Sequence, residues 1–298
     1  MPNSTPTESD VDGRRHHSKE PLRLHRDQFP NRPILDTAIS HAMLRRVAAG
    51  VVGNSLRLYL PSRALLFSSL DARRPGFVRA LELAVEAGFP PVTRLAGGQA
   101  AMFLDESIAF AWATRDVDAH LRIRPRFEAL AEWIARSLRR LGLDARVGEI
   151  PGEYCPGEFS VNLGGRVKVM GVGQRVIRGG AHIGGVLTVA QTGLLRQTLA
   201  EIYEVLGLEF HEQTAGGVAD FDESLDCEQI LAAMIEELSE SGYVLEAQTF
   251  DESIIGEAEQ LLPLHDPQAK SPSGGGLGTL LRASRHAGKT VVQEESEN

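Results

Sequence analysis

The sequence has few cysteines, no long apolar run and no excess of positive charge, and each shortage excludes a class of protein. Only Cys155 and Cys227 occur in 298 residues, so a disulfide-stapled scaffold is excluded and a reducing compartment is expected. The net charge of −9 argues against binding along a nucleic-acid backbone. No run approaches the roughly 20 apolar residues that span a bilayer, and the first residues lack the apolar core of a signal peptide. We therefore expect a soluble, cytoplasmic protein with neither nucleic acid nor membrane as a partner.

The two ends of the chain differ in composition from its middle. Residues 1–32 are rich in Pro, Ser, Asp, Arg and His, and residues 265–298 contain KSPSGGGLG and finish in QEESEN. Such composition predicts disordered tails, with the histidines of the first tail, including His25, in solvent. Residues 33–264 are predicted to form the folded domain.

Helical and strand-like segments alternate within residues 33–264. In 124–141, apolar residues such as Phe127 and Ile134 recur at three- and four-residue steps opposite arginines, which predicts a helix. Helices are also expected at 36–47, 77–88, 193–206 and 230–238, and strands at 55–60, 64–68, 91–95, near 102, 110–113, 166–177, 181–190 and 243–250. Several neighbouring strands are joined by turns too short for parallel crossovers. The expected fold is therefore α+β (mixed α/β), a mostly antiparallel mixed sheet flanked by helices.

A glycine pair follows the strand expected at 91–95, within the run RLAGGQA at 94–100. Paired glycines allow positive φ and let backbone N–H groups approach an anion, and a nearby arginine adds positive charge. A plain hairpin turn is the alternative. The candidate anion-binding residues of this run are Arg94, Gly97, Gly98 and Gln99.

The strand expected at 166–177 contains an unusual lysine. Strand periodicity puts Lys168 and Gln174 on one face, together with the two even-numbered residues between them. A lysine in an apolar segment is costly unless it meets an anion, although an edge strand can also carry one to discourage aggregation. Gly171 and Gly173 weaken the strand, which indicates that another group passes close to its backbone.

One histidine and one cysteine can carry chemistry. His182 lies between two glycine pairs without a second ligand at a recognisable spacing, so no metal site is expected. It is either a structural residue or an orienting or acid–base group. Cys155 lies in a loop by composition, where positive charge can favour the thiolate, but such a cysteine can equally be structural. Cys227 has acidic neighbours that raise its pKa, which argues against a nucleophile there.

Taken in order, three segments resemble motifs of the biotin/lipoate protein ligase catalytic-domain superfamily, and within it the lipoate–protein ligase A and octanoyltransferase family. Residues 94–100 resemble its Arg-Arg-Ser-Gly-Gly-Gly-Ala loop, residues 165–175 its Gly-Arg-Lys and Gly-Ser-Ala-Gln-Arg segment, and residues 181–184 its Gln-His-Gly strand. The resemblance implies an enzyme that attaches a lipoyl or octanoyl group to a lysine of a lipoyl-domain protein. Such acceptors are the E2 subunits of 2-oxoacid dehydrogenases and the H protein of glycine cleavage.

The resemblance leaves two chemical routes open. In the ligase route, ATP and Mg²⁺ activate lipoate, and Lys168 holds carboxylate and phosphate oxygens. In the transferase route, no cofactor is needed: acyl carrier protein delivers octanoate as a thioester, and Cys155 forms an acyl-enzyme. In either route the residues implied to line the substrate or cofactor site are Arg94, Gly97, Gly98, Gln99, Gly171, Gly173, Gln174, Arg175 and His182.

The motifs also depart from the family pattern. Gln99 replaces the third glycine of the loop, Leu95 and Ala96 replace its Arg-Ser pair, and Val167 separates an arginine from a lysine that are often adjacent. A different acyl substrate, or a non-catalytic ligand-binding or scaffold paralogue, is therefore a further alternative.

Overall fold

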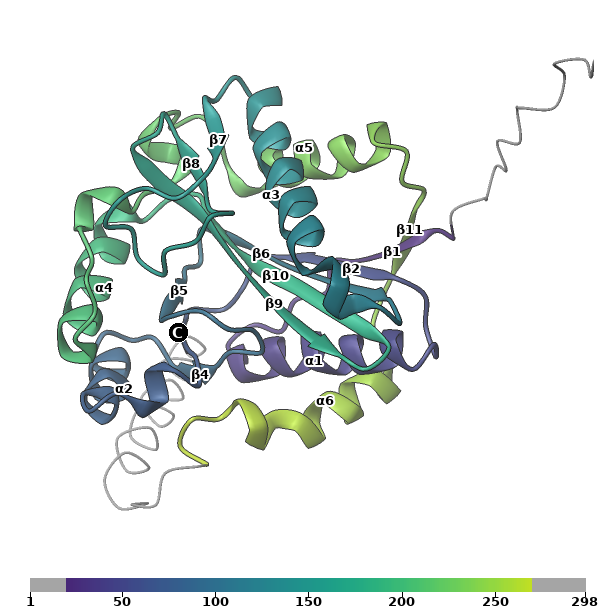
Figure 1. Ribbon diagram of the computed structural model, residues 1–298, viewed down its shortest axis with the longest axis horizontal. Coiled ribbons are helices and arrows are strands. Elements are labelled where there is room, and N and C mark those ends of the chain that lie inside the picture. The colour runs from purple at the N-terminus through teal and green to yellow at the C-terminus, as the bar shows by residue number, and fades with distance from the viewer. Residues whose placement is uncertain (1–19, 270–298) are drawn as a thin grey trace, which may run out of the picture.

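Two sheets organise residues 20–269, the part of the chain that the computed structural model describes (Figure 1). The larger sheet has the strand order β11-β1-β2-β6-β10-β9-β8-β7, and the smaller has the order β4-β3-β5. In chain order the strands are β1 (Leu22–His25), β2 (Ser55–Tyr59), β3 (Ala64–Phe67), β4 (Pro91–Thr93), β5 (Ala101–Phe103), β6 (Ser107–Arg115), β7 (Ala145–Val147), β8 (Val161–Leu163), β9 (Val167–Ile177), β10 (Gly180–Thr188) and β11 (Leu245–Gln248).

The expected fold class is confirmed by the strand pairing. In the larger sheet β1 pairs in parallel with β2 and β11, and the remaining pairs among the described strands are antiparallel. In the smaller sheet β3 is parallel to β4 and antiparallel to β5. The molecule is thus a mostly antiparallel mixed sheet with a small second sheet beside it.

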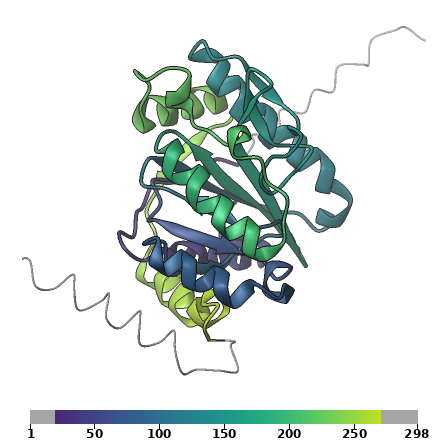
Figure 2. The same cartoon turned by 90° about the vertical axis from the view of Figure 1, so that its left-hand side faces the viewer.

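Helices cover both faces of the larger sheet. They are α1 (Pro33–Ala48), α2 (Phe77–Glu86), α3 (Ile123–Arg140), α4 (Thr192–Leu206), α5 (Cys227–Glu240) and α6 (Glu252–His265). In Figure 1, α3 and α5 lie above the sheet and α1 and α6 below it. Figure 2 shows α4, in green, beside α2, in blue, where both pack on the small sheet. None of the described helices is long and apolar enough to cross a membrane.

The most strongly periodic helix forms as predicted. In α3, the side chains of Leu130, Trp133, Ile134 and Leu138 are buried against the larger sheet, and arginines occupy the exposed side. Trp133 Nε1 also donates a hydrogen bond of 3.0 Å to the Met234 carbonyl of α5. Burial of one apolar face therefore accounts for this helix.

The first strand lies in a segment that the sequence analysis assigned to a tail, and for residues 22–25 that assignment is wrong. Leu22 and Leu24 are buried, and β1 pairs with two strands. His25 is buried rather than solvated. It stacks on Phe250 with ring centroids 4.2 Å apart, and burial lowers its pKa to about 4. Four residues are too few to show a period, and the partners of β1 come from distant parts of the chain.

Three further elements were not predicted: β7, β8 and α6. The two strands have three residues each, which again leaves no period to detect. Helix α6 carries a signal that was overlooked, because the Asp251 side chain caps it by accepting a hydrogen bond from Ile254 N. The helix includes His265, which is buried and had been placed in the second tail. Residues 1–19 and 270–298 of the two predicted tails lie outside the described residues.

Candidate active site

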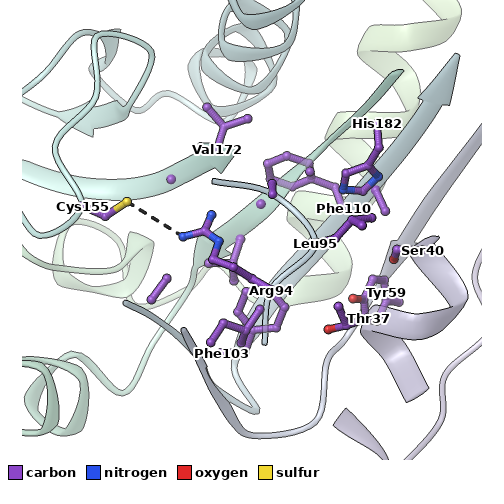
Figure 3. A pocket seen from close by; sticks show the side chains of 18 of the residues that line it. Thr37, Ser40, Tyr59, Arg94, Leu95, Phe103, Phe110, Cys155, Val172 and His182 are labelled. Carbon is purple, nitrogen blue, oxygen red and sulfur yellow. Dashed lines mark hydrogen bonds between the residues drawn. The ribbon is translucent and has the colours of Figure 1, made fainter. Parts of the chain in front are cut away.

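Two of the motifs singled out in the sequence meet around the thiol of Cys155. The loop between β7 and β8 carries this residue, and the loop between β4 and β5 carries Arg94 and Gln99. The backbone N–H of Gln99 donates to Cys155 Sγ at 3.1 Å, and Arg94 Nη1 lies 4.0 Å from the same sulfur (Figure 3). Arg94 Nη1 also donates to the Gln99 carbonyl at 2.7 Å. The thiol therefore faces an N–H group and a guanidinium.

Glycines allow these backbones to approach so closely. Gly98 has φ +112°, and a Cβ there would lie 2.9 Å from Cys155 Sγ. A Cβ on Gly173 of β9 would lie 3.0 Å from the Ala96 Cβ and from Arg94 Nη2. Gly97 has no such neighbour within 4 Å. The group that passes close to Gly173 is thus the 94–100 loop itself.

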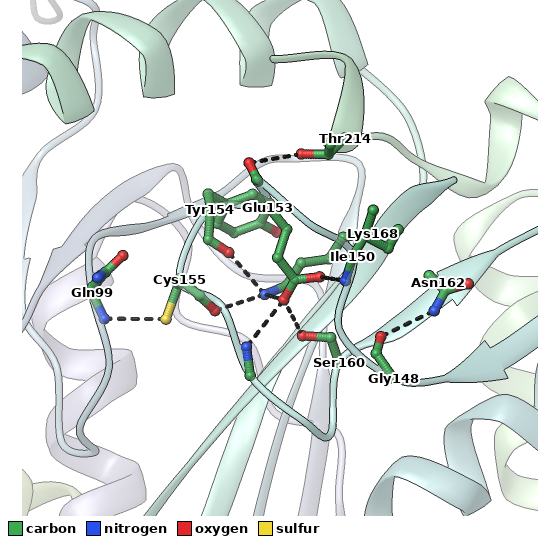
Figure 4. A network of polar contacts seen from close by, with 12 residues as sticks. Gln99, Gly148, Ile150, Glu153, Tyr154, Cys155, Ser160, Asn162, Lys168 and Thr214 are labelled. Carbon is green, nitrogen blue, oxygen red and sulfur yellow. Dashed lines mark hydrogen bonds and ion pairs between the residues drawn. The ribbon is translucent and has the colours of Figure 1, made fainter. Parts of the chain in front are cut away.

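Lys168 of β9 is buried, with 1% of its surface exposed, and meets an anion from within the chain. Its Nζ donates to Glu153 Oε1, to the Tyr154 carbonyl and to the Cys155 carbonyl, each at 2.9 Å (Figure 4). An ammonium has three protons to donate, and all three are engaged here. The bond to the Cys155 carbonyl ties the lysine directly to the residue that carries the thiol.

Glu153 organises the loop that presents the thiol, and sequence reasoning gave it no role. Its carboxylate is 0% exposed and pairs with Lys168. One oxygen also accepts from Ser160 Oγ at 2.5 Å and Gly157 N at 3.2 Å, and the other accepts from Ile150 N at 2.9 Å. An acidic residue in a loop is ordinary in a sequence. Only its burial beside a lysine reveals its function.

Tyr203 of α4 joins the two loops and was also missed. Its buried hydroxyl accepts a hydrogen bond from Cys155 N and donates one to the Ala100 carbonyl, both at 2.8 Å. Cys155 itself has φ +43°, an uncommon conformation for a residue with a side chain. The tyrosine therefore helps to hold Cys155 in a conformation that its own backbone does not favour.

A cavity of about 70 Å³ extends from the thiol into the protein. One end is formed by Cys155 and Lys168, and apolar side chains including Phe103 and Phe110 form its walls. Figure 3 shows His182 and the side chains of α1 at the other end, away from the thiol. The residues of α1 and β2 at this inner end are Thr37, Ser40 and Tyr59. One water molecule takes up roughly 10–15 Å³ of such cavity volume. A cavity of about 70 Å³ therefore has room for a narrow, extended chain of atoms.

His182 lies at the inner end of the cavity and does not touch the thiol. It is 5% exposed, and burial, with smaller contributions from His41 and Arg94, lowers its pKa to about 3. The imidazole is therefore neutral at neutral pH. Its Nδ1 has no hydrogen-bond partner among the described residues.

Neither Gln174 nor Arg175 lines the cavity that contains Cys155, Lys168 and His182. Val161 pairs with Met170 but Asn162 pairs with Lys168, so β9 has one extra residue at this point, a β-bulge. Beyond the bulge, the alternation of side chains between the two faces of the sheet is shifted by one residue. The prediction that Gln174 shares a face with Lys168 is therefore wrong. Its side chain donates to the Ile123 carbonyl and accepts from Arg126 on the α3 side.

Arg175 is exposed, whereas Gly171 and Gly173 face the site. A Cβ on Gly171 would lie 3.4 Å from Lys168 Cε.

The second cysteine is not part of the site. Burial, followed by the charges of Glu106, Asp226 and Glu228, raises the pKa of Cys227 to about 11. The predicted direction of this shift is confirmed, although burial contributes more than the acidic neighbours. No group of three His, Cys, Asp or Glu side chains within residues 20–269 is arranged to hold a metal ion.

Known proteins share this fold and part of this sequence. The family model of the lipoyl protein ligase A/B catalytic domain matches residues 33–238. Two curated relatives are named octanoyl-[GcvH]:protein N-octanoyltransferase. The one from Exiguobacterium sp. is 29% identical over 54% of this chain and 56% of its own length. The one from Geobacillus kaustophilus is 27% identical over 61% and 65%. This chain thus spans less than two thirds of either relative.

Solved structures agree on the fold. A lipoate-protein ligase A bound with ATP has a TM-score of 0.67 at 22% identity and covers 81% of this chain and 94% of its own. The bi-partite lipoate protein ligase from Thermoplasma acidophilum has a TM-score of 0.65 at 20% identity, with 85% and 95% covered. Because the family model covers well over half of the chain, the resemblance seen in the sequence is confirmed: the chain belongs to the lipoyl protein ligase A/B catalytic-domain family.

Proposed function

We propose that this protein transfers an octanoyl or related acyl group to a lysine of a lipoyl-domain protein through an acyl-enzyme on Cys155. The observation that carries this proposal is the position of the Cys155 thiol at one end of the inner cavity, beside the Gln99 N–H and the Arg94 guanidinium. The name of the curated relatives, octanoyl-[GcvH]:protein N-octanoyltransferase, supports the same reaction class. The residues that carry the reaction lie in one folded unit, the predicted domain 33–264 extended by β1 and the end of α6.

The ligase route suits these residues less well. Activation by ATP needs cations that are free to hold phosphate oxygens and ligands that can position Mg²⁺. Here the three protons of Lys168 are engaged by Glu153 and two carbonyl groups. Arg94 is directed to the Gln99 carbonyl and the thiol. The proposed mechanism therefore includes no nucleotide.

The reaction proceeds in two displacements on the acyl carbon. The Cys155 sulfur, as thiolate, attacks the carbonyl carbon of the donor. A carbon–sulfur bond forms, the bond to the donor's leaving atom breaks, and that atom takes up the proton that the thiol had released to water. The acceptor lysine, as a free amine, then attacks the thioester. The amide forms, the amine loses a proton to water, and Cys155 leaves as thiolate.

The chain's own residues orient these steps. The Gln99 N–H and the Arg94 guanidinium stabilise negative charge on sulfur before the attack and after its release. Lys168 holds the Cys155 carbonyl, and Glu153 holds the loop. The narrow cavity receives the acyl chain, and its apolar walls suit methylene groups. Placed at the far end, His182 lines the acyl site and takes no part in proton transfer.

The names of related proteins indicate which donor and acceptor proteins this enzyme would use. The names of the curated proteins include GcvH, and the Thermoplasma ligase was studied with an E2 lipoyl domain. We propose octanoyl-GcvH as donor and E2 lipoyl domains as acceptors, with octanoyl-acyl carrier protein as an alternative donor. Both cysteines are free, which suits a reducing compartment such as the cytoplasm.

The test is to follow the mass of an apo E2 lipoyl domain by intact-protein mass spectrometry. Parallel reactions contain octanoyl-GcvH, octanoyl-acyl carrier protein, or octanoate with MgATP. We expect the acceptor to gain an octanoyl group from a protein donor without ATP, with octanoyl trapped on Cys155 when the acceptor is omitted. A gain only with MgATP would establish the ligase route instead. No gain in any reaction would identify a non-catalytic paralogue.

Tyr203→Phe tests whether the α4 hydroxyl positions the thiol. The variant leaves the buried Cys155 N–H and Ala100 carbonyl without a partner, which should lower the free energy of unfolding by about 1–3 kcal/mol. We expect acylation of Cys155 to slow by roughly tenfold, since small displacements of a reacting group cost much rate. Urea unfolding and single-turnover mass spectrometry measure the two effects. A variant with unchanged acylation would show that the tyrosine only stabilises the fold.

A further inference from the structure

Within the described part of the chain, strand β9 has a free edge along residues 171–177, more than half of its length. On one side β9 pairs with β10 over Met170–Ile177, but on the other side β8 pairs only with Val167, Lys168 and Met170. The chain that leads into β8 turns away before it could continue this pairing, and Ser160 N donates to the Gly157 carbonyl at 2.9 Å. Among residues 20–269, no strand therefore lies beside residues 171–177 on that side.

A groove of about 460 Å³ borders this edge and ends at the thiol. Helix α3 contributes Ile123 and Phe127 to one wall, and the loop after Cys155 contributes Pro156 and Phe159 to the other. Phe127 stacks on Phe159 with ring centroids 5.2 Å apart, which joins the two walls. The remaining lining residues are Gly97, Gly98, Gly157, Ser160, Lys168, Val172, Gly173, Gln174 and Val176.

The groove and the inner cavity meet at Cys155, Lys168 and Val172, which line both. In the proposed function the inner cavity holds the acyl chain, so the second reactant must reach the thioester from the groove. That reactant is a lysine on a protein. The groove offers it unpaired backbone groups, apolar walls and no free ammonium, because Lys168 is fully engaged. Such a lining matches a polypeptide backbone better than a phosphate group.

We propose that the free edge of β9 binds the lysine-bearing segment of the acceptor as an added strand, which delivers its amine to the thioester on Cys155. This inference rests on the proposed function and specifies how its partner is held. An extended segment would pair with those N–H and C=O groups of residues 171–177 that point away from β10, and alternate side chains would face the apolar walls. The hydrogen bonds of Gln174 to Arg126 and Ile123 hold α3 in place, so the groove exists before the partner arrives.

The charge beside the groove indicates the chemistry of that segment. In residues 169–178 the charged side chains are Arg175 and Arg178, both basic, in a chain whose net charge is −9. Arg175 and Arg178 are exposed near the hairpin end and form no ion pair with a described residue. The matching segment therefore carries acidic residues near its lysine.

Hydrogen–deuterium exchange measures the contact without requiring chemistry. The full-length Cys155→Ser protein is mixed with an apo E2 lipoyl domain, and exchange is followed by peptide mass spectrometry. We expect the amides of residues 171–177 that point away from β10 to exchange at least fivefold more slowly in the complex. Protection confined to other surfaces would overturn the proposal. So would complete protection of these outward-pointing amides without the acceptor, because another part of this chain would then cover the edge.

A pair of matched variants tests the same contact during turnover. Val176→Asp puts a charge into the groove, and Val147→Asp puts one on β7, the strand at the end of the same sheet. We expect the first variant to raise the KM for the lipoyl domain at least tenfold and the second to leave it unchanged. Equal effects would overturn the proposal. Acylation of Cys155 by a small octanoyl thioester tests the proposed function separately, because it needs no acceptor protein.

Discussion

Replacing Cys155 by serine is expected to reduce acyl transfer by about a thousandfold or more, because the hydroxyl lacks the nucleophilicity of a thiolate. The Gln99 N–H and Tyr203 contacts can persist around a serine side chain, so the fold should be retained. Intact-protein mass spectrometry of the acceptor measures the transfer, and circular dichroism checks the fold.

Cys227→Ser is the matched control for this substitution. The pKa of Cys227 is raised to about 11 by burial, so this thiol is not a nucleophile at neutral pH, and its removal should leave transfer unchanged. A Cys155→Ser protein that still labels the acceptor at the native rate would exclude the acyl-enzyme and return attention to direct attack by lysine on an activated acyl group.

Lys168→Met is expected to destabilise the protein by about 3–5 kcal/mol, because it leaves the Glu153 carboxylate buried without its cation. Transfer should also fall by about a hundredfold or more, since the Cys155 carbonyl and the loop lose their anchor. Urea unfolding measures the free energy of unfolding, and acylation of Cys155 measures the chemistry.

The double variant Lys168→Met with Glu153→Gln separates the two effects. A neutral amide in place of the carboxylate removes the unpaired buried charge, so much of the lost stability should return. Its oxygen can still accept from Ile150 N or Ser160 Oγ. We expect activity to stay low, because no ammonium holds the Cys155 carbonyl. Recovery of full activity with stability would show that Lys168 acts only through the fold.

The elements that could be predicted are those whose pattern is local. The periodicity of α3 is present in its own eighteen residues, and the β-prone runs of β9 and β10 are long enough to be recognised. The glycine pairs at 97–98 and 184–185 could also be recognised in the sequence, because paired glycines indicate a place where another group approaches the backbone closely. The order of these motifs was sufficient to indicate the family.

The site itself depends on contacts between distant segments. Cys155 meets Gln99 across 56 residues, and Tyr203 meets Ala100 across 103. Glu153 could not be distinguished from a surface residue until Lys168 was placed beside it. The face of the sheet on which the Gln174 side chain lies depends on a β-bulge. This bulge arises from the pairing of β9 with β8 and leaves no mark in the β9 sequence.

The sequence alone therefore determined the fold class, the family and the residues Arg94, Gly98, Cys155 and Lys168 as candidates, because local periodicity and motif order are properties of neighbouring residues. Only the tertiary structure decided that Lys168 is neutralised by Glu153, that β1 belongs to the sheet and that residues 171–177 of β9 have a strand on one side only within the described part of the chain. These features are set by which segments pack together. Burial and pairing are properties of two partners at once, and neither partner's local sequence contains them.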